Sequence, residues 1–532
     1  MANVPSSDSY LNIFSTLPAG KKLKPFSRQE VGQHAKEGDL WCIVDTAVYD
    51  LSSFVDMHPG GASVLLDKNV AGKDATEAFF GLHRSEVLKK YGRYLIGNIQ
   101  GEQPKYMLQK DGELSLVPHS EPGWLSKGYS SPYYNEGHRK FQKAMRLFFD
   151  QHVTPQAREH ELTGKKITQE LVDLMGTTHV NAMRLGPGKH LHGLTLPSGL
   201  KGEDYDYFHE LILTQEMGRT GARGFSDGML GGMVIGLPPV LNFGSPELKS
   251  KIIPEVLSGK KYIALAISEA FAGSDVAGLR CTAVKTPDGK HYIVNGTKKW
   301  ITNGTFADYF STGVRTDKGL SMLLIERGEG VETKPIKTSY SPAAGTAYIS
   351  FDNVKVPATN LLGVENKGLQ VILSNFNHER WIMCCGVIRA SRFVTEECLK
   401  WAHQRKVFGK PLINQPVIRQ KFAQMFAKCE ATQSWLEHVT YQMNKMSYAE
   451  QADLLAGQIG LLKAYSTRVA HEVADEAVQI FGGRGISATG MGRFVEMFQR
   501  SYKFDAVLGG SEEILFDLGV RQAMRKMPNA VL

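Results

Sequence analysis

The 532-residue chain contains few cysteines and no long apolar run. No stretch reaches the roughly 20 apolar residues that a membrane-spanning helix needs, and the N-terminus lacks the apolar core of a signal peptide. The six cysteines include no C-x-x-C pair and no zinc-ligand spacing, which indicates reduced, mostly buried thiols. These absences predict a soluble intracellular protein without a membrane span.

Long runs of one charge are also missing. Lys and Arg exceed Asp and Glu by 8, a mild excess that suits anionic small molecules at least as well as nucleic acid. No nucleic-acid-binding motif is present, so nucleic acid is not an expected partner.

Targeting signals are equally scarce. Asp8 and the lack of arginine before Arg28 are unlike a mitochondrial presequence, and Ala530-Val531-Leu532 lacks the basic middle residue of a peroxisomal tripeptide. The sequence therefore leaves the compartment open between cytoplasm, peroxisome and mitochondrion.

The most informative stretch runs from Ile263 to Gly304. It begins with an apolar strand pattern, IALAI, and ends with HYIVNG, a second strand pattern, followed by KKWITNG. Trp300 next to Thr302 suits a flat ring system that needs a stacking wall and a hydroxyl donor. Taken alone, each half is better explained as an ordinary hairpin with a surface tryptophan.

Together the two halves resemble the flavin-binding β-domain of the acyl-CoA dehydrogenase family, whose usual wording is close to TEPGAGSDV and KxWITNG. The resemblance implies that Ser268 and Thr302 hydrogen-bond the flavin edge, that Trp300 covers one flank of the flavin, and that Ser274 faces the thioester arm of CoA. Ser-Glu-Ala stands at 268–270 where the family has Thr-Glu-Pro. A hydroxyl is kept, but without the proline we expect a looser loop.

The N-terminal quarter carries two separated histidines, His58 in HPGG and His83 after GKDATEAFFGL. Isolated histidines are usually not ligands, but two imidazoles can close both axial positions of a haem. From LWCIVDTAVYDLSSF to GRYLIGNI the segment resembles a cytochrome b5 domain. The resemblance implies haem b, with His58 and His83 as its axial ligands, and a role in electron transfer. A haem-free relic is the alternative.

Helical periodicity dominates the rest of the chain, from about 136 to 260 and from about 366 to 525. The glycine-rich run from Gly218 to Gly236 suits either the wall of an acyl cavity or tight helix packing. The predicted fold is multidomain α+β. Its parts are a polar tail (1–23), a small α+β haem domain (24–100), a linker (101–135), an N-terminal helical domain (136–260), a flavin-binding β-domain (261–365) and a C-terminal four-helix bundle (366–532).

The same family resemblance adds cofactor contacts to the C-terminal bundle. Arg405 and Phe408 in RKVFG match a pair that reaches the FAD of a neighbouring subunit, with the guanidinium facing the pyrophosphate. Gln479 and Gly483 in QIFGGRG match positions on the adenosine side, and Ser511 is assigned to the same cofactor. The shared sites imply a homodimer or homotetramer.

The expected chemistry removes a proton alpha to a thioester carbonyl while a hydride passes to flavin, and it needs a carboxylate base. Most relatives place this base in a stretch resembling YEGTSEI, where this chain has Gly509. A subset resembling the isovaleryl- and long-chain-type enzymes places it in a Glu-Arg pair on another helix. The run NFNHERW supplies Glu379 and Arg380 at that place.

Glu379 is therefore the predicted base, in an apolar cavity that should raise its pKa. The alternative is a surface carboxylate paired with a nearby cation. Arg380 is assigned to substrate binding. The backbone N–H of Gly509 is the predicted donor to the thioester oxygen.

These features predict an FAD-dependent dehydrogenase that desaturates an acyl-CoA and passes electrons from the reduced flavin to the fused haem. Electrons could instead flow from haem to flavin for a reductive or oxygen-activating reaction, and an external acceptor or donor could take part. A non-catalytic acyl-CoA-binding protein is the third alternative, favoured by Gly509 and opposed by Glu379. The acyl chain is left undefined.

Overall fold

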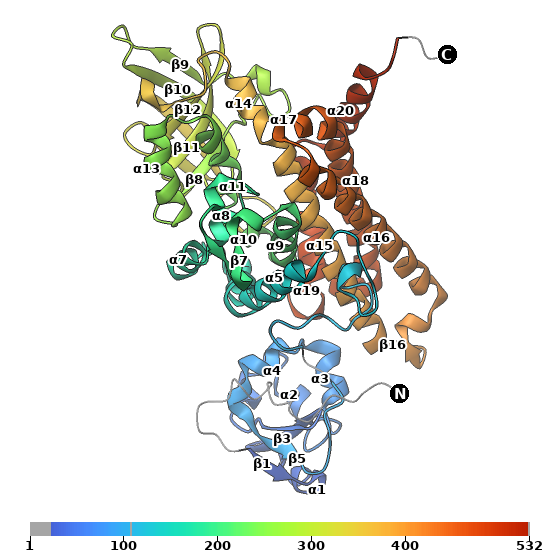
Figure 1. Cartoon of the computed structure of the whole chain (residues 1–532). Helices are drawn as coiled ribbons and strands as arrows, with labels where there is room; N and C mark the ends of the chain where they lie inside the picture. Colours follow the sequence, from blue (N-terminus) through green and yellow to red (C-terminus); the bar gives the residue numbers. More distant parts are fainter. Residues whose placement is uncertain (1–22, 107–108, 530–532) are drawn as a thin grey trace. The chain divides into compact units, whose positions relative to one another are not determined.

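The computed structural model describes residues 23–106 and 109–529, and Figure 1 traces the order of their elements. The predicted polar tail up to residue 22 and the terminal Ala530-Val531-Leu532 lie outside the described residues. The chain divides into two compact units. One contains the described residues up to 110 together with 399–418 and 481–493, and the other contains the remainder.

The smaller unit contains a five-stranded sheet in the order β1-β5-β4-β3-β2. β3 and β4 form an antiparallel hairpin, and Asp45 between them adopts a left-handed φ of 61° that suits a tight turn. In Figure 1 the short helices α2, α3 and α4 lie on one side of this sheet. The elements are β1 Lys24–Phe26, α1 Arg28–Val31, β2 Ala35–Lys36, β3 Asp39–Val44, β4 Ala47–Asp50, α2 Ala62–Leu65, α3 Thr76–Leu82, α4 Glu86–Lys90 and β5 Leu95–Ile99. From β1 to β5 this unit has the expected small α+β fold, and it also includes two segments that we predicted to belong to the C-terminal bundle, 399–418 and 481–493.

The larger unit begins with helices that carry well-formed N-terminal caps. Asn135 caps α5, Asp206 caps α9 and Ser245 caps α13, each accepting the backbone N–H of the residue three positions on. The helices are α5 Glu136–Phe148, α6 Thr154–Thr163, α7 Gln169–Thr177, α8 Val180–Met183, α9 Tyr207–Gly218, α10 Arg223–Gly228, α11 Gly231–Gly236, α12 Pro238–Phe243 and α13 Pro246–Leu257, with a small β6–β7 ladder (Thr195–Leu196, Leu200–Lys201).

A second sheet of eight strands follows, in the order β13-β14-β10-β9-β11-β12-β15, with β8 added beside β11. β10 and β14 pair antiparallel, and their register shifts between Lys298 and Ile301. Trp300 lies in this irregular step with a φ of 71°. Such bulges often re-aim a side chain next to a functional site. The strands are β8 Ile263–Ala266, β9 Thr282–Lys285, β10 His291–Ile301, β11 Tyr309–Thr316, β12 Gly319–Glu326, β13 Val331–Pro335, β14 Ala347–Pro357 and β15 Leu361–Leu362.

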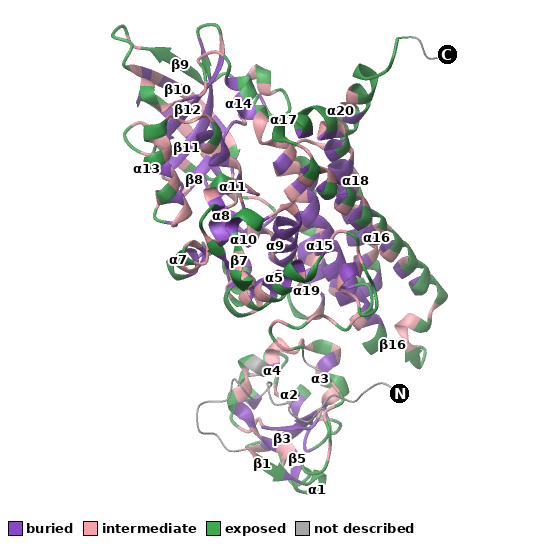
Figure 2. Cartoon of the chain, in the orientation of Figure 1, coloured by how far each residue is buried: buried purple, intermediate pink, exposed green. Residues whose placement is uncertain are grey.

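Long helices form the C-terminal part, as expected. Arg392 of α15 pairs with Glu430 of α16 at 2.8 Å, and Thr467 of α18 donates to Glu512 of α20 at 2.9 Å. Figure 2 shows buried residues along the facing sides of α15, α16 and α18. The elements are α14 Gly368–Ser374, α15 Phe376–Gln404, β16 Lys406–Val407, β17 Lys410–Pro411, α16 Pro416–Lys445, α17 Tyr448–Glu450, α18 Ala456–Phe481, α19 Arg493–Val507 and α20 Glu512–Arg525. No helix within 23–106 and 109–529 combines the length and apolar character needed to cross a bilayer.

The second half of the predicted linker packs into the larger unit. Glu121 is buried and accepts two hydrogen bonds from Arg146, each at 2.9 Å, and one from Arg389 at 2.8 Å. Trp124 stacks on Tyr134 with 4.0 Å between ring centroids. Residues from 111 onward are therefore held against the helices by a buried ion-pair network rather than free to swing.

Candidate active site and haem site

A cavity of about 180 Å³ lies within the larger unit, lined by residues of α9, α10, α11, α15 and α19. The exposed surface of its wall is mostly apolar, as is usual for small-molecule sites, but five charged side chains also line it: Arg184, Arg223, Asp227, Glu379 and Asp505. Two of the residues singled out in the sequence, Glu379 and Thr302, line this cavity together.

Helices α9 and α15 form one wall and run side by side with a constant register. Glu210 contacts His378 at 2.8 Å, and eight residues further along both helices Gly218 faces Gly386. A Cβ atom at Gly218 would lie 2.7 Å from the Gly386 carbonyl oxygen. Gly218 therefore both lines the cavity and permits close helix packing, so both suggested roles of the glycine-rich run apply at this position.

Glu379 lies in the first turn of α15 and is partly buried. Burial raises the pKa of its carboxyl group, while the positive charges of Arg380 and Lys463 act in the opposite direction. The direction agrees with the expectation of a carboxylate in an apolar cavity. The protonated and ionised forms are thereby brought closer in energy, which suits a group that must take up a proton.

Gly509 lies directly against this carboxylate. A Cβ atom at Gly509 would be 3.6 Å from Oε1 of Glu379 and 2.8 Å from Sδ of Met383. Gly509 also has a left-handed φ of 66°. The Glu379 carboxylate thus occupies space next to the position where a side chain at residue 509 would project, so one carboxylate at either position would serve the same region of the cavity.

Two cations hold the backbone around Gly509. Nε of Arg380 donates to the Gly509 carbonyl at 2.9 Å, and Nζ of Lys463 donates to the Gly510 carbonyl at 2.6 Å. Arg380 was expected to bind substrate, but in the structure its hydrogen bond goes to this backbone. Lys463 is fully buried, and burial lowers its pKa to about 8. Sequence reasoning missed Lys463, whose signal was a lysine inside the apolar run GLLKAYS.

The flavin-related residues lie just after β8 (Ser268) and at the end of the irregular strand β10 (Trp300 and Thr302). The backbone N–H of Lys299 donates to the Ser268 carbonyl at 2.9 Å, which joins the two halves of the motif. Trp300 is 49% exposed. A large aromatic side chain held out by a left-handed backbone is consistent with a surface that a flat ligand covers. Ser274 lies exposed in the loop after β8.

Glu269 braces that loop, which sequence reasoning also missed. Its carboxylate accepts a hydrogen bond from Lys298 at 2.8 Å and from the backbone N–H groups of Arg280 and Cys281 at 2.7 and 2.9 Å. Glu269 and Lys298 are both buried. The loop that lacks the family's proline is therefore fixed by a buried ion pair, contrary to the looser loop we expected.

The remaining cofactor assignments fall on exposed positions. Arg405, Gln479 and Gly483 are exposed, Ser511 is partly buried at the start of α20, and Phe408 is 95% exposed with a φ of 49°. Phe408 lies in the turn between β16 and β17. An aromatic side chain this exposed is available for contact with another molecule.

His58 and His83 face each other in the smaller unit. Their ring centroids are 6.0 Å apart at an angle of 83°. Two metal–nitrogen bonds of about 2 Å each fit between rings at this separation. Burial lowers the pKa of His83, and His58 lowers it further, which favours the neutral imidazole that binds metal. Phe54 and Phe79 lie beside the two rings, so the residues present fit a haem with two axial histidines.

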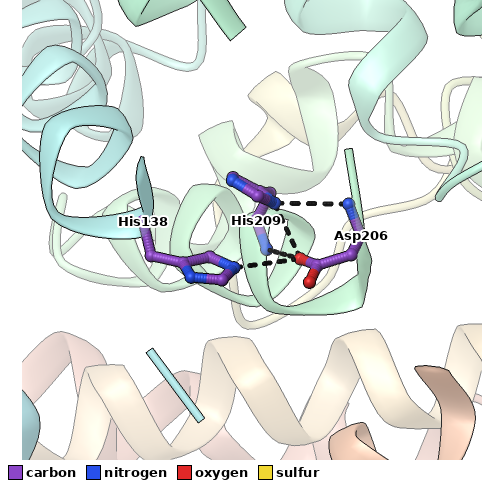
Figure 3. Close-up of side chains that lie close together, drawn as sticks. All are labelled: His138, Asp206 and His209. Atoms are coloured by element: carbon purple, nitrogen blue, oxygen red, sulfur yellow. Dashed lines mark hydrogen bonds and ion pairs between the residues drawn. The ribbon is translucent and has the colours of Figure 1, made fainter. Parts of the chain in front are cut away.

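A third cluster, His138, Asp206 and His209, has the residue types of a metal site (Figure 3). Its atoms are already engaged in helix capping. The Asn135 backbone N–H donates to Nδ1 of His138, which leaves the proton on Nε2 to donate to Asp206 at 3.2 Å. Nδ1 of His209 lies 2.7 Å from the same Asp206 oxygen. These contacts join the N-termini of α5 and α9, and they account for the cluster as a structural joint.

Comparison with known families covers both units. The family model described as "Cytochrome b5-like Heme/Steroid binding domain" matches residues 27–100. The N-terminal, middle and C-terminal domains of acyl-CoA dehydrogenase match residues 135–260, 264–354 and 366–524. The chain is similar to acyl-CoA dehydrogenase apdG of Emericella nidulans (39% identity, 78% of this chain and 96% of that one).

Further relatives and a solved structure point to the same family. Acyl-CoA dehydrogenase AFT10-1 of Alternaria alternata is 34% identical over 78% of this chain and 97% of its own. Isovaleryl-CoA dehydrogenase of Pongo abelii is 29% identical over 71% and 87%. A putative-dehydrogenase structure from Mycobacterium smegmatis superposes with a TM-score of 0.65 at 27% identity, covering 75% of this chain and all of that one. The chain belongs to the acyl-CoA dehydrogenase family of FAD-dependent oxidoreductases and carries a cytochrome b5-like haem-binding domain at its N-terminus.

Proposed function

We propose that the chain desaturates an acyl-CoA thioester, with Glu379 as the base, and that the electrons pass from FAD to the haem of the N-terminal domain. The observation that carries the proposal is the position of Glu379. Its carboxylate lines the cavity beside Gly509, and Thr302 lines the same cavity. Burial raises the pKa of this carboxyl group.

The chain's own residues would perform the proton transfer. A thioester held in the cavity presents its alpha carbon to Glu379, whose carboxylate takes the proton as the C–H bond breaks. The backbone N–H of Gly509 stabilises the negative charge that develops on the thioester oxygen. Arg380 and Lys463 fix the carbonyls of residues 509 and 510, so this N–H keeps its direction during the reaction.

The same arrangement supports contacts between the β-domain and the flavin. Ser268 and Thr302 would hold the edge of FAD, and Trp300 would cover its flank. When bound, FAD supplies the acceptor for the beta hydride. Arg405, Phe408, Gln479, Gly483 and Ser511 would contact the remainder of the cofactor, and the exposure of Phe408 and Arg405 supports a site shared between subunits of a homo-oligomer. Ser274 would face CoA.

His58 and His83 would hold the haem iron. Held by two imidazoles, the haem would supply one-electron transfer rather than oxygen binding. Fusion to the dehydrogenase supports direct electron transfer between flavin and haem, because a tethered partner has a high effective concentration.

An anaerobic titration of the purified holoprotein with acyl-CoAs of different chain length tests the proposal. We expect one or more thioesters to bleach the flavin absorbance and then to produce the sharp bands of reduced b-type haem. A panel that leaves the flavin oxidised, while dithionite reduces haem before flavin, would contradict both the reaction and the direction of electron flow.

A further inference from the structure

Arg184 is a buried cation in the wall of the active-site cavity. It follows the end of α8, is 5% exposed, and lines the same cavity as Glu379 and Thr302. Among the described residues, the hydrogen bond that Arg184 makes is from Nη1 to the carbonyl oxygen of Met229. The guanidinium has five N–H donors in a planar fork, so one bond to this carbonyl leaves most of its donors for water or a ligand.

Two carboxylates act on Arg184 through their charge, and each of them contacts another residue. Asp227 and Glu210 are the residues whose charges act on it. Asp227 pairs with Arg223 at 2.5 Å through Oδ1, and Glu210 contacts His378 at 2.8 Å through Oε1. The second oxygen of each carboxylate is buried without a hydrogen-bond partner among the described residues. Within the described part of the chain, no carboxylate oxygen lies within 4.0 Å of the Arg184 guanidinium.

This arrangement is unfavourable unless a ligand completes it. A buried arginine is normally paired with a carboxylate, because desolvation of an unpaired charge is costly. Burial lowers the pKa of Arg184 to about 10, so it stays charged at neutral pH. Water can solvate the guanidinium in the empty cavity, but a purely hydrocarbon chain would displace that water without replacing its hydrogen bonds.

Arg184 lies at the reacting end of the cavity. Glu210, whose charge acts on Arg184, contacts the residue just before Glu379. The apolar end is elsewhere, because Phe393 lies fourteen residues beyond Glu379, about 21 Å further along α15 at 1.5 Å per residue. A Cβ atom at Gly221 would lie 2.7 Å from Phe393 and 3.1 Å from Phe494, which places these two rings together.

From this layout we infer that Arg184 binds a carboxylate carried by the acyl group within a few carbons of the thioester. The inference rests on the proposed acyl-CoA oxidation and names its substrate class: a monothioester of a dicarboxylic acid, with any hydrocarbon branch directed toward Phe393 and Phe494. A guanidinium can hold such a carboxylate with two parallel hydrogen bonds. The same contact would place the alpha carbon against Glu379.

The test compares thioesters of matched carbon number, glutaryl-CoA with valeryl-CoA and succinyl-CoA with butyryl-CoA. The proteins are the holoenzyme, Arg184→Met, Arg184→Lys, and Arg521→Met as a control that removes an exposed charge from α20. The kcat/KM of each thioester is measured alongside its dissociation constant by calorimetry and the FAD content of each protein.

We expect the wild type to prefer the carboxylated thioesters. Arg184→Met should lower their kcat/KM and affinity by at least about 30-fold while leaving the plain acyl-CoAs within about threefold. Arg184→Lys should lie between, because the ammonium keeps the charge but loses the fork. Arg521→Met should behave as wild type.

Three results would overturn the inference: no preference in the wild type, an equal effect of Arg184→Met on both thioester classes, or loss of FAD from Arg184→Met, which would assign Arg184 to the flavin. Turnover of plain acyl-CoAs by the wild type would leave the proposed function standing in each case. If no thioester is oxidised, the proposed function fails, and the calorimetric comparison still decides whether Arg184 selects a carboxylate.

Discussion

Arg380 and Gly509 are joined by a hydrogen bond of 2.9 Å from Nε to the carbonyl oxygen. This bond links the residue that follows the proposed base to the position where most relatives are expected to carry theirs. It makes the Glu-Arg pair on α15 and the glycine before α20 one structural unit. A change at either residue should therefore alter the other's geometry as well as its own.

The first prediction concerns the space around Gly509. In Gly509→Ala the new Cβ would lie 2.8 Å from Sδ of Met383. The alanine would also have to adopt the left-handed φ of 66°, which is unfavourable for a residue with a side chain. We expect kcat to fall at least about tenfold, equivalent to about 1.4 kcal/mol in the barrier, with FAD content unchanged. Gly328→Ala is the matched control, because no atom lies within 4 Å of its Cβ position. Equal kcat values in wild type and Gly509→Ala would contradict the proposed role of this backbone.

A second prediction uses the charge of Lys463. Glu379 must be ionised to accept a proton, so activity should rise as the pH increases through the pKa of Glu379. Burial raises this pKa, and the positive charge of Lys463 partly lowers it. Removing the lysine in Lys463→Met should raise that pKa further and shift the acid limb of the kcat profile to higher pH. Lys463→Arg should keep the limb close to its wild-type position. A shift to lower pH, or the same limb in all three proteins, would argue against the coupling.

Lys463 also predicts a dependence of stability on pH. Its folded pKa is about 8, below the ordinary value of 10.5. The unfolded chain therefore binds more protons between these values, and the lysine's contribution to the free energy of unfolding should increase as pH rises from about 8 to about 10.5. Denaturant unfolding across this range should show that increase in the wild type and its absence in Lys463→Met.

The buried ion pair under the flavin loop supplies a further prediction. Lys298→Met leaves the buried Glu269 carboxylate without its cation, which should cost about 3–5 kcal/mol of stability. The double variant Lys298→Met/Glu269→Gln should recover part of that loss, since it removes the unpaired charge. Thermal unfolding and FAD content measure both effects. A single variant as stable as wild type would show that Glu269 is neutral or solvated and that the pair does not brace the loop.

His83→Ala separates the two cofactor sites. Removing one axial ligand should weaken haem binding and abolish the spectrum of a haem with two axial histidines, while acyl-CoA still bleaches the flavin. His192→Ala, an exposed histidine, is the control. An unchanged haem spectrum in His83→Ala would exclude this residue as a ligand, and loss of flavin bleaching would show that the two sites are not independent.

Much of this architecture was predictable from local sequence patterns. The strand of IALAI, the helical periodicity after residue 366 and the paired histidines at 58 and 83 each carry their signal within a short window. The family resemblance supplied Glu379 and Gly509 as alternative positions of one carboxylate, and the structure places them side by side.

Arg184, Lys463 and the Lys298–Glu269 pair were not predictable. Lys463 and the Lys298–Glu269 pair depend on partners that are distant in sequence. Arg184 is notable because it has no ion-pair partner among the described residues. Lys463 finds its acceptor 47 residues later, and a lysine within an apolar helix is ordinarily one whose ammonium reaches solvent. The burial of Arg184 arises only when α8, α11 and α15 close around the cavity.

The most direct test of the central claim is the rate of flavin bleaching after anaerobic mixing with a saturating acyl-CoA, in wild type, Glu379→Gln and the exposed control Glu332→Gln. We predict that Glu379→Gln retains FAD and haem, and that its bleaching is slower by at least about 100-fold, with Glu332→Gln equal to wild type. Bleaching of Glu379→Gln at the wild-type rate would show that another group takes the proton.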